Sequence, residues 1–144
     1  MEYTMKNMLV PALAATMILG CNVMPTDKTH LLGQEWIIED IAGGGVIDNS
    51  QPSLLFLADG QLAGSGSCNR IIGGYQLNGK QLTIKPAGAT MMMCPEALMN
   101  QEDKLMRLLP TVKNYYLDKT GALVLTTTNG ERIVARHQGA GRAD

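Results

Sequence analysis

Apolar and polar residues alternate with a period of two over most of the chain, and turn residues interrupt the pattern about every ten positions. One segment, 96–109, instead repeats its apolar residues at helical spacing, with Pro95 suited to the first helical position and Pro110 as the stop. We therefore expect a mainly β protein, a small antiparallel β-barrel or half-barrel with one helix packed against it. The alternation predicts strands at 35–41, 53–57, 61–65, 75–77, 80–84, 112–117, 122–127 and 131–135.

Two strands carry the strongest signals. Trp36 is the single tryptophan, and at a first strand it favours a core role over a ligand-stacking role. Asn78-Gly79 predicts the tight turn of a hairpin, and Pro86 is expected to end the strand that follows it. The inward face of this hairpin should carry Tyr75, Leu77, Leu82 and Ile84.

The apolar line of the predicted helix runs through Leu98, Leu105 and Leu109. Glu102 lies on the same line and is a slight imperfection in it. The opposite, polar face should be covered by Asn100, Gln101, Asp103, Lys104 and Arg107.

Residues 64–75 hold four glycines together with Cys68 and Asn69. Because glycine allows backbone paths that other residues resist, this density predicts a tight crossing between strands. Asn69 and Arg70 are the polar residues of the stretch that are candidates for binding. The alternative is structural: Asn69 bonds nearby backbone in a turn, and Arg70 is an ordinary surface residue.

Residues 8–20 are uncharged and apolar, too short for a stable membrane anchor, and end in Ile18-Leu19-Gly20-Cys21. This ending resembles a bacterial lipobox, so we expect a signal peptide over 1–20, starting at Met1 or Met5, and lipidation of Cys21. The alternative is an ordinary signal peptide. Asn22 favours sorting to the outer membrane, facing the periplasm, with 21–30 as the lipidated cysteine and its tether. Residues 138–144 should be a disordered tail.

The net charge of −1 gives no reason to expect nucleic acid as a partner. Of the three cysteines, lipidation of Cys21 leaves Cys68 and Cys94, and an even remainder in an oxidising compartment predicts one disulfide. Closing a loop of about 25 residues would stabilise the fold by about 3 kcal/mol.

Catalysis is not expected, because His30 and His137 are the only imidazoles and both lie outside the predicted strands. We expect neither an enzyme nor a cofactor. Met91, Met93 and Cys94 raise the alternative of a Cu(I) site, which requires Cys94 to be reduced. Core packing by the methionines, with Cys94 in a disulfide, is the favoured interpretation.

Residues 66–75, then Thr90-Met91-Met92-Met93-Cys94 and a helix beginning near Glu96, resemble the META/HslJ domain family. The resemblance covers about residues 31–137. It implies a compact β-rich exported domain, often on bacterial lipoproteins and associated with heat or envelope stress, with no catalytic residues to transfer. We therefore expect a monomeric, non-catalytic envelope lipoprotein, held at the membrane by its N-terminal lipid and serving as a structural or binding module. The alternative is a soluble periplasmic protein that binds copper or a small ligand.

Overall fold

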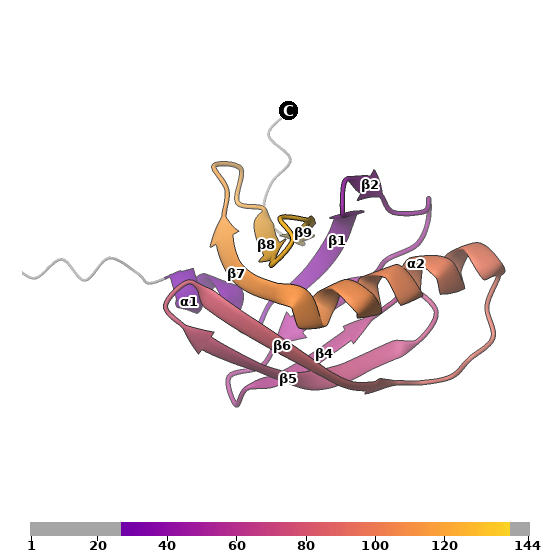
Figure 1. Ribbon diagram of the computed structural model, residues 1–144, viewed down its shortest axis with the longest axis horizontal. Helices are drawn as coiled ribbons and strands as arrows, with labels where there is room; N and C mark the ends of the chain where they lie inside the picture. Colours follow the sequence, from indigo (N-terminus) through magenta and orange to yellow (C-terminus); the bar gives the residue numbers. More distant parts are fainter. Residues whose placement is uncertain (1–26, 139–144) are drawn as a thin grey trace, which may run out of the picture.

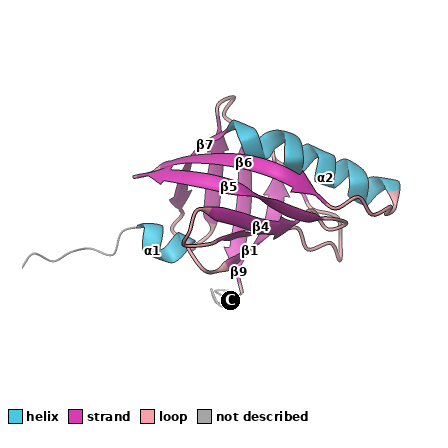
Figure 2. Cartoon of the chain, turned by 90° about the horizontal axis from the view of Figure 1, so that it is seen from below, coloured by secondary structure: helices cyan, strands magenta, loops and turns pink. Residues whose placement is uncertain are grey.

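Eight antiparallel strands close into a barrel in the computed structural model, which describes residues 27–138 (Figures 1 and 2). The strand order is β1-β3-β4-β5-β6-β7-β8-β9, and β9 pairs back with β1. The strands are β1 (Glu35–Ile41), β2 (Gly44–Gly45), β3 (Ser53–Phe56), β4 (Gln61–Ser65), β5 (Arg70–Asn78), β6 (Gln81–Ala89), β7 (Val112–Leu117), β8 (Leu123–Thr127) and β9 (Arg132–His137). The two-residue β2 pairs only with β1 within the described residues. The expected fold class is confirmed, as a closed barrel.

The N-terminal end of the barrel is built around Trp36, which is 1% exposed. Its indole N–H donates to the carbonyl of Leu31, 3.0 Å away, at the end of helix α1 (Asp27–Leu31). Leu31 is itself fully buried, and the first strand begins at Glu35, as predicted. Residues 27–30, expected as tether, are helical, whereas 1–26 and 139–144 lie outside the described residues.

The β5–β6 hairpin is longer than the sequence predicted. Its central turn residues are Gly79 and Lys80, because Asn78 already pairs with Gln81. Pro86 does not end β6, which continues to Ala89. The proline is accommodated next to a bulge, where it lies opposite Gly73. A Cβ on that glycine would lie 2.6 Å from the carbonyl oxygen of Lys85, so the two strands approach closely only because it has none.

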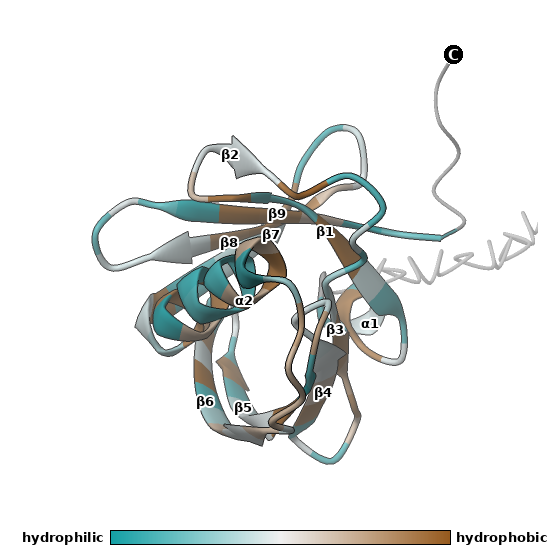
Figure 3. Ribbon diagram, turned by 90° about the vertical axis from the view of Figure 1, so that its right-hand side faces the viewer, coloured by the Kyte–Doolittle hydropathy of each residue, from teal (hydrophilic) through white to brown (hydrophobic). Residues whose placement is uncertain are grey.

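Helix α2 (Glu96–Leu108), continued by the 3-10 turn η1 (Leu109–Thr111), lies between β6 and β7 (Figure 3). Within the described residues these two strands pair at Gln81 and Asn114, and the N–H of Tyr115 donates to the carbonyl of Lys80, at 3.0 Å. Leu105, Leu108 and Leu109 are buried on the inner side of the helical segment. The helix therefore fills the side of the barrel that strand pairing leaves open.

Two residues of the predicted polar face of α2 also bond to other parts of the fold, whereas Asn100, Asp103 and Arg107 are exposed. Lys104 donates through Nζ to the carbonyl of Ile41, 2.7 Å away, at the end of β1. Gln101 accepts through Oε1 from the backbone N–H of Ile47, at 2.8 Å. Pro95 is the N-cap residue rather than the first helical one. No helix within residues 27–138 is long and apolar enough to cross a membrane.

Candidate functional site

Asn69, a predicted binding residue, is 6% exposed and uses all of its side-chain hydrogen-bonding capacity inside the protein. Its Nδ2 donates to Oε1 of Glu102, at 2.7 Å, and to the carbonyl of Met92, at 3.4 Å. Its Oδ1 accepts from the N–H of Met92, at 2.6 Å, and from the hydroxyl of Thr90, at 3.0 Å. The side chain therefore joins three segments of the chain. Its role is structural, as the alternative interpretation expected, but its partners lie farther along the chain than those of a local turn.

Glu102 is the residue that sequence reasoning missed. It comes from α2, is 8% exposed, and accepts through Oε2 from the backbone N–H of Asn69, at 2.7 Å. A buried carboxylate is costly unless donors face it, and here the turn supplies two. Gly66 makes the room, because a Cβ there would lie 2.2 Å from Oε2. An acid on the apolar line of a helix was the available signal for this contact.

The predicted disulfide is present: Cys68 and Cys94 are bonded, with their Cα atoms 5.9 Å apart. The stretch around Cys68 is a hairpin turn between β4 and β5, not a crossing between strands. The N–H of Gly66 donates to the carbonyl of Asn69, at 2.8 Å, and Ser67 takes a positive φ of 89°. Gly66, Cys68, Asn69, Cys94 and Glu102 together form what we call the β4–β5 lock.

Arg70 lies beside the lock but is exposed. Its backbone N–H donates to the hydroxyl of Thr90, at 3.0 Å, and its side chain has no hydrogen bond or ion pair among those found in residues 27–138. The two predicted binding residues therefore have different roles. Asn69 holds the fold together, whereas Arg70 is available on the surface.

The methionine segment does not pack into the core, so the favoured interpretation is wrong on this point. Met91 is 95% exposed, Met92 58% and Met93 88%. Because the Cys94 sulfur is bonded to Cys68, it offers no thiolate to a metal, and the predicted set of Met91, Met93 and Cys94 cannot form in this oxidised state.

The two histidines lie in different settings. His30 is exposed on α1, and His137 belongs to β9, not to a loop, where it packs edge-on against Trp36 with ring centroids 5.3 Å apart. Between residues 27 and 138, no group of three or more histidine, cysteine, aspartate and glutamate residues is placed to hold a metal ion.

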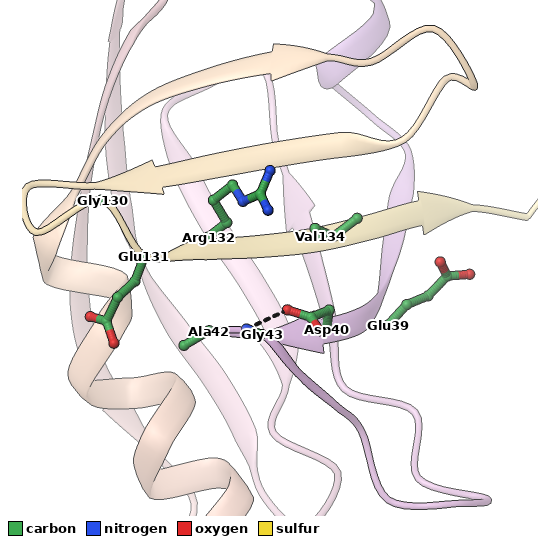
Figure 4. Close-up of a pocket in the computed structure, with 8 residues that line it drawn as sticks. All are labelled: Glu39, Asp40, Ala42, Gly43, Gly130, Glu131, Arg132 and Val134. Atoms are coloured by element: carbon green, nitrogen blue, oxygen red, sulfur yellow. Dashed lines mark hydrogen bonds between the residues drawn. The ribbon is translucent and has the colours of Figure 1, made fainter.

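A polar pocket of about 460 Å³ lies between the β1–β2 turn and the β8–β9 turn (Figure 4). Its acidic groups do not converge on one point. Asp40 accepts from the N–H of Gly43, at 2.8 Å, and Glu39 pairs with Arg136, at 3.0 Å. Figure 4 shows the Glu131 side chain pointing away from both. The pocket is lined by charged side chains, but no two of them are placed to react together.

A second pocket, of about 660 Å³, lies between the β2–β3 loop and the start of α2. Gln101 borders it by donating to the hydroxyls of Ser50, at 3.1 Å, and Ser67, at 3.3 Å. Hydroxyls and amides of this kind suit a small polar ligand. The lining residues are Ile47, Asp48, Asn49, Ser50, Gln51, Ser65, Ser67, Pro95, Ala97 and Leu98.

A closed antiparallel barrel with an inserted helix and one disulfide defines a small β-rich domain class. The chain belongs to the META domain family, whose model matches residues 29–140. This range includes the whole described barrel and confirms the resemblance found in the sequence.

Solved structures share the fold at low sequence identity. An NMR structure of a protein from Burkholderia xenovorans is 17% identical, with a TM-score of 0.65, over 96% of this chain and 98% of that one. A second protein solved by NMR is 24% identical, with a TM-score of 0.58, over 75% and 92%. A duf4847 family protein from Bacteroides vulgatus is 17% identical, with a TM-score of 0.50, over 63% and 61%. No curated protein matches the sequence.

Proposed function

We propose that this META domain protein is a lipid-anchored envelope protein that acts without catalysis, as a structural or binding module in the response to heat or envelope stress. The observation that carries the proposal is the pairing of Cys68 with Cys94. A disulfide favours an exported, oxidising location, and it leaves Cys21, after Ile18-Leu19-Gly20, as the one remaining cysteine of the sequence.

The short distance from Cys21 to the barrel supports this function. Five residues lie between Cys21 and Asp27, where α1 begins, and such a segment spans at most about 20 Å. A lipid on Cys21 would hold the barrel close to the membrane surface, as a monomer facing the periplasm. The outer membrane is the proposed location because Asn22 follows the cysteine.

The absence of catalysis is proposed from what the family motif does. Asn69, a buried polar residue of the motif, uses all of its side-chain hydrogen bonds on Glu102, Met92 and Thr90, and no substrate could take their place without opening the lock. Arg70 is an exposed, charged residue of the motif and is left for contact with an envelope partner.

Mass spectrometry of the membrane-bound protein tests the proposal. An acylated N-terminal Cys21 together with an oxidised Cys68–Cys94 pair is the expected result, and a Cys21→Ser variant should be released into the soluble periplasmic fraction. An unmodified Cys21 in a soluble protein would favour the alternative, a periplasmic binder of a metal or small ligand.

A growth assay under heat or envelope stress tests the binding role. Arg70→Ala should fold normally yet reduce protection if Arg70 contacts a partner, whereas Lys113→Ala, at an exposed position of β7, is the matched control. Protection equal to that of the parent protein in Arg70→Ala would remove Arg70 from the proposal.

A further inference from the structure

Three of the six large apolar side chains that are exposed within residues 27–138 are consecutive: Met91, Met92 and Met93. Burying a methionine side chain is worth about 1.5–3 kcal/mol, so a segment that exposes three of them forgoes a large stabilisation. Core packing does not explain these residues. Their exposure needs another reason.

The side chains of the segment are exposed, but its backbone is bonded to the rest of the fold. Asn69 bonds both the N–H and the carbonyl of Met92, at 2.6 and 3.4 Å, much as a neighbouring strand would. Two residues later, Cys94 is joined to Cys68. Met91 and Met93 are the most exposed of the three, at 95% and 88%, and Met92, between them, is the least, at 58%. The lock therefore presents two thioethers from a backbone fixed on both sides.

A third thioether lies at the same place. Met99, half-buried on α2, lines a pocket of about 280 Å³ together with the methionine segment. Two carboxylates, Glu102 and Asp103, complete the acidic part of its wall. Glu102 is occupied by Asn69, whereas Asp103 is exposed, so the pocket has soft sulfur donors beside negative charge.

This donor set selects a class of ion. Thioethers favour soft, monovalent Cu(I) and its analogue Ag(I), whereas Ca²⁺ and Mg²⁺ need several oxygen ligands. We propose that Met91, Met93 and Met99 bind a soft monovalent cation of the Cu(I) class, with Asp103 balancing its charge. The site differs from a cysteine-based one because it needs the disulfide intact. The proposal goes beyond the envelope function above and does not rest on the lipid.

The site also has a suitable position. In Figure 1 the connection between β6 and α2, which carries the methionines, lies at the end of the molecule opposite α1. If the chain is anchored ahead of α1, this connection lies away from the membrane, where a dissolved ion or a metal-carrying protein can reach it.

Titration with Ag(I), which unlike Cu(I) is not oxidised by air, tests the proposal on the disulfide-bonded protein carrying ¹³C-methyl methionine. The methyl signals of Met91, Met93 and Met99 should shift together and saturate at one ion per protein, while Met106, farther along α2, should not shift. Met91→Leu/Met93→Leu keeps the apolar volume and should weaken Ag(I) binding by about ten-fold or more. Met106→Leu is the matched control and should bind as the parent does.

Two results would overturn the site. One is saturation with Ag(I) that leaves the Met91 and Met93 methyl signals in place. The other is a double variant that binds Ag(I) as tightly as the parent while its circular dichroism and disulfide remain unchanged. Equal binding of Ca²⁺ would also refute it, since oxygen donors alone would then account for the affinity. None of these results bears on Cys21 acylation, so the two proposals fail independently.

Discussion

The β4–β5 lock and the methionine segment share a backbone contact, yet they treat their side chains in opposite ways. In the lock, the amide of Asn69 and the carboxylate of Glu102 are buried and hydrogen-bonded. The lock holds the backbone of Met92. The side chains of Met91 and Met93, one residue to either side, are almost fully exposed. The difference indicates that the motif combines two tasks. Buried polar contacts fix the backbone, and the fixed backbone presents side chains that take no part in folding.

The disulfide is the largest expected contribution to the lock. Cys68→Ala/Cys94→Ala removes a crosslink across a sequence separation of 26 residues. In the chain-entropy model this lowers the free energy of unfolding by about 3.5 kcal/mol. Urea denaturation of the parent and the variant measures it, with Cys21→Ser as the control that leaves the barrel intact. A loss well below 1 kcal/mol would show that hydrogen bonds alone hold the turn.

Asn69→Ala should cost nearly as much, about 3 kcal/mol, because it leaves a buried Glu102 oxygen and the Met92 backbone without partners. Arg70→Ala, on the neighbouring exposed residue, should change the unfolding free energy by less than about 0.5 kcal/mol. The pair of urea curves separates the structural member of the motif from its surface member. Equal effects of the two variants would contradict the distinction.

Gly66→Ala tests the fit of Glu102 against the turn. The added Cβ would lie 2.2 Å from Oε2, so the carboxylate must move and lose donors, at a cost of about 2 kcal/mol. Gly88→Ala is the matched control, because a Cβ there has open space and the backbone is not strained. Thermal unfolding of both should show a lower Tm for Gly66→Ala alone. A similar shift in both would mean that Glu102 yields easily.

Met91→Leu/Met93→Leu should barely affect stability, by less than about 0.5 kcal/mol, because neither side chain packs against the barrel. This is the opposite result from the lock, a few residues away. A loss above 1 kcal/mol in urea denaturation would show that the methionines cover apolar surface, and the comparison between the two regions would break down.

The sequence predicted most of the strands because turn residues and alternation are local. Asn129-Gly130 and Asp59-Gly60 mark turns that the structure contains, with positive φ at both glycines. Pro86 was misleading because the bulge opposite Gly73 that accommodates it depends on the neighbouring strand. Pairing of β1 with β9 joins residues about a hundred positions apart, and no local pattern encodes it.

The candidate site was predictable only in part, for the same reason. Counting cysteines gave the Cys68–Cys94 bond. The Asn69–Glu102 contact spans 33 residues and joins a turn to a helix, so each residue by itself suggested something else. Asn69 was a candidate either for binding or for a bond to nearby backbone in a turn, and Glu102 looked like an imperfection in an apolar line. The burial of the Glu102 carboxylate and of the Asn69 amide is understood only when the structure shows that they hydrogen-bond to each other.

Asp118 provides the smallest test, since it is a less buried counterpart of Glu102. Its carboxylate accepts from the hydroxyl and N–H of Thr120 and from the N–H of Ala122, at 2.6, 2.7 and 3.0 Å. These bonds, with that from the Thr120 side chain foremost, hold the pKa of Asp118 below its usual 3.8. A depressed carboxyl pKa adds stability above the unfolded value, and this contribution is lost as pH falls through the folded value. The unfolding free energy of the parent should therefore decline below about pH 4 more steeply than that of Asp118→Asn. NMR titration of the Asp118 carboxyl carbon checks the direction, and a midpoint at or above 3.8 would contradict it.

Because water competes for each hydrogen bond of Asp118, the effect on the unfolding free energy should be far smaller than that of Asn69→Ala. Burial, rather than the number of hydrogen bonds, therefore sets the strength of the lock.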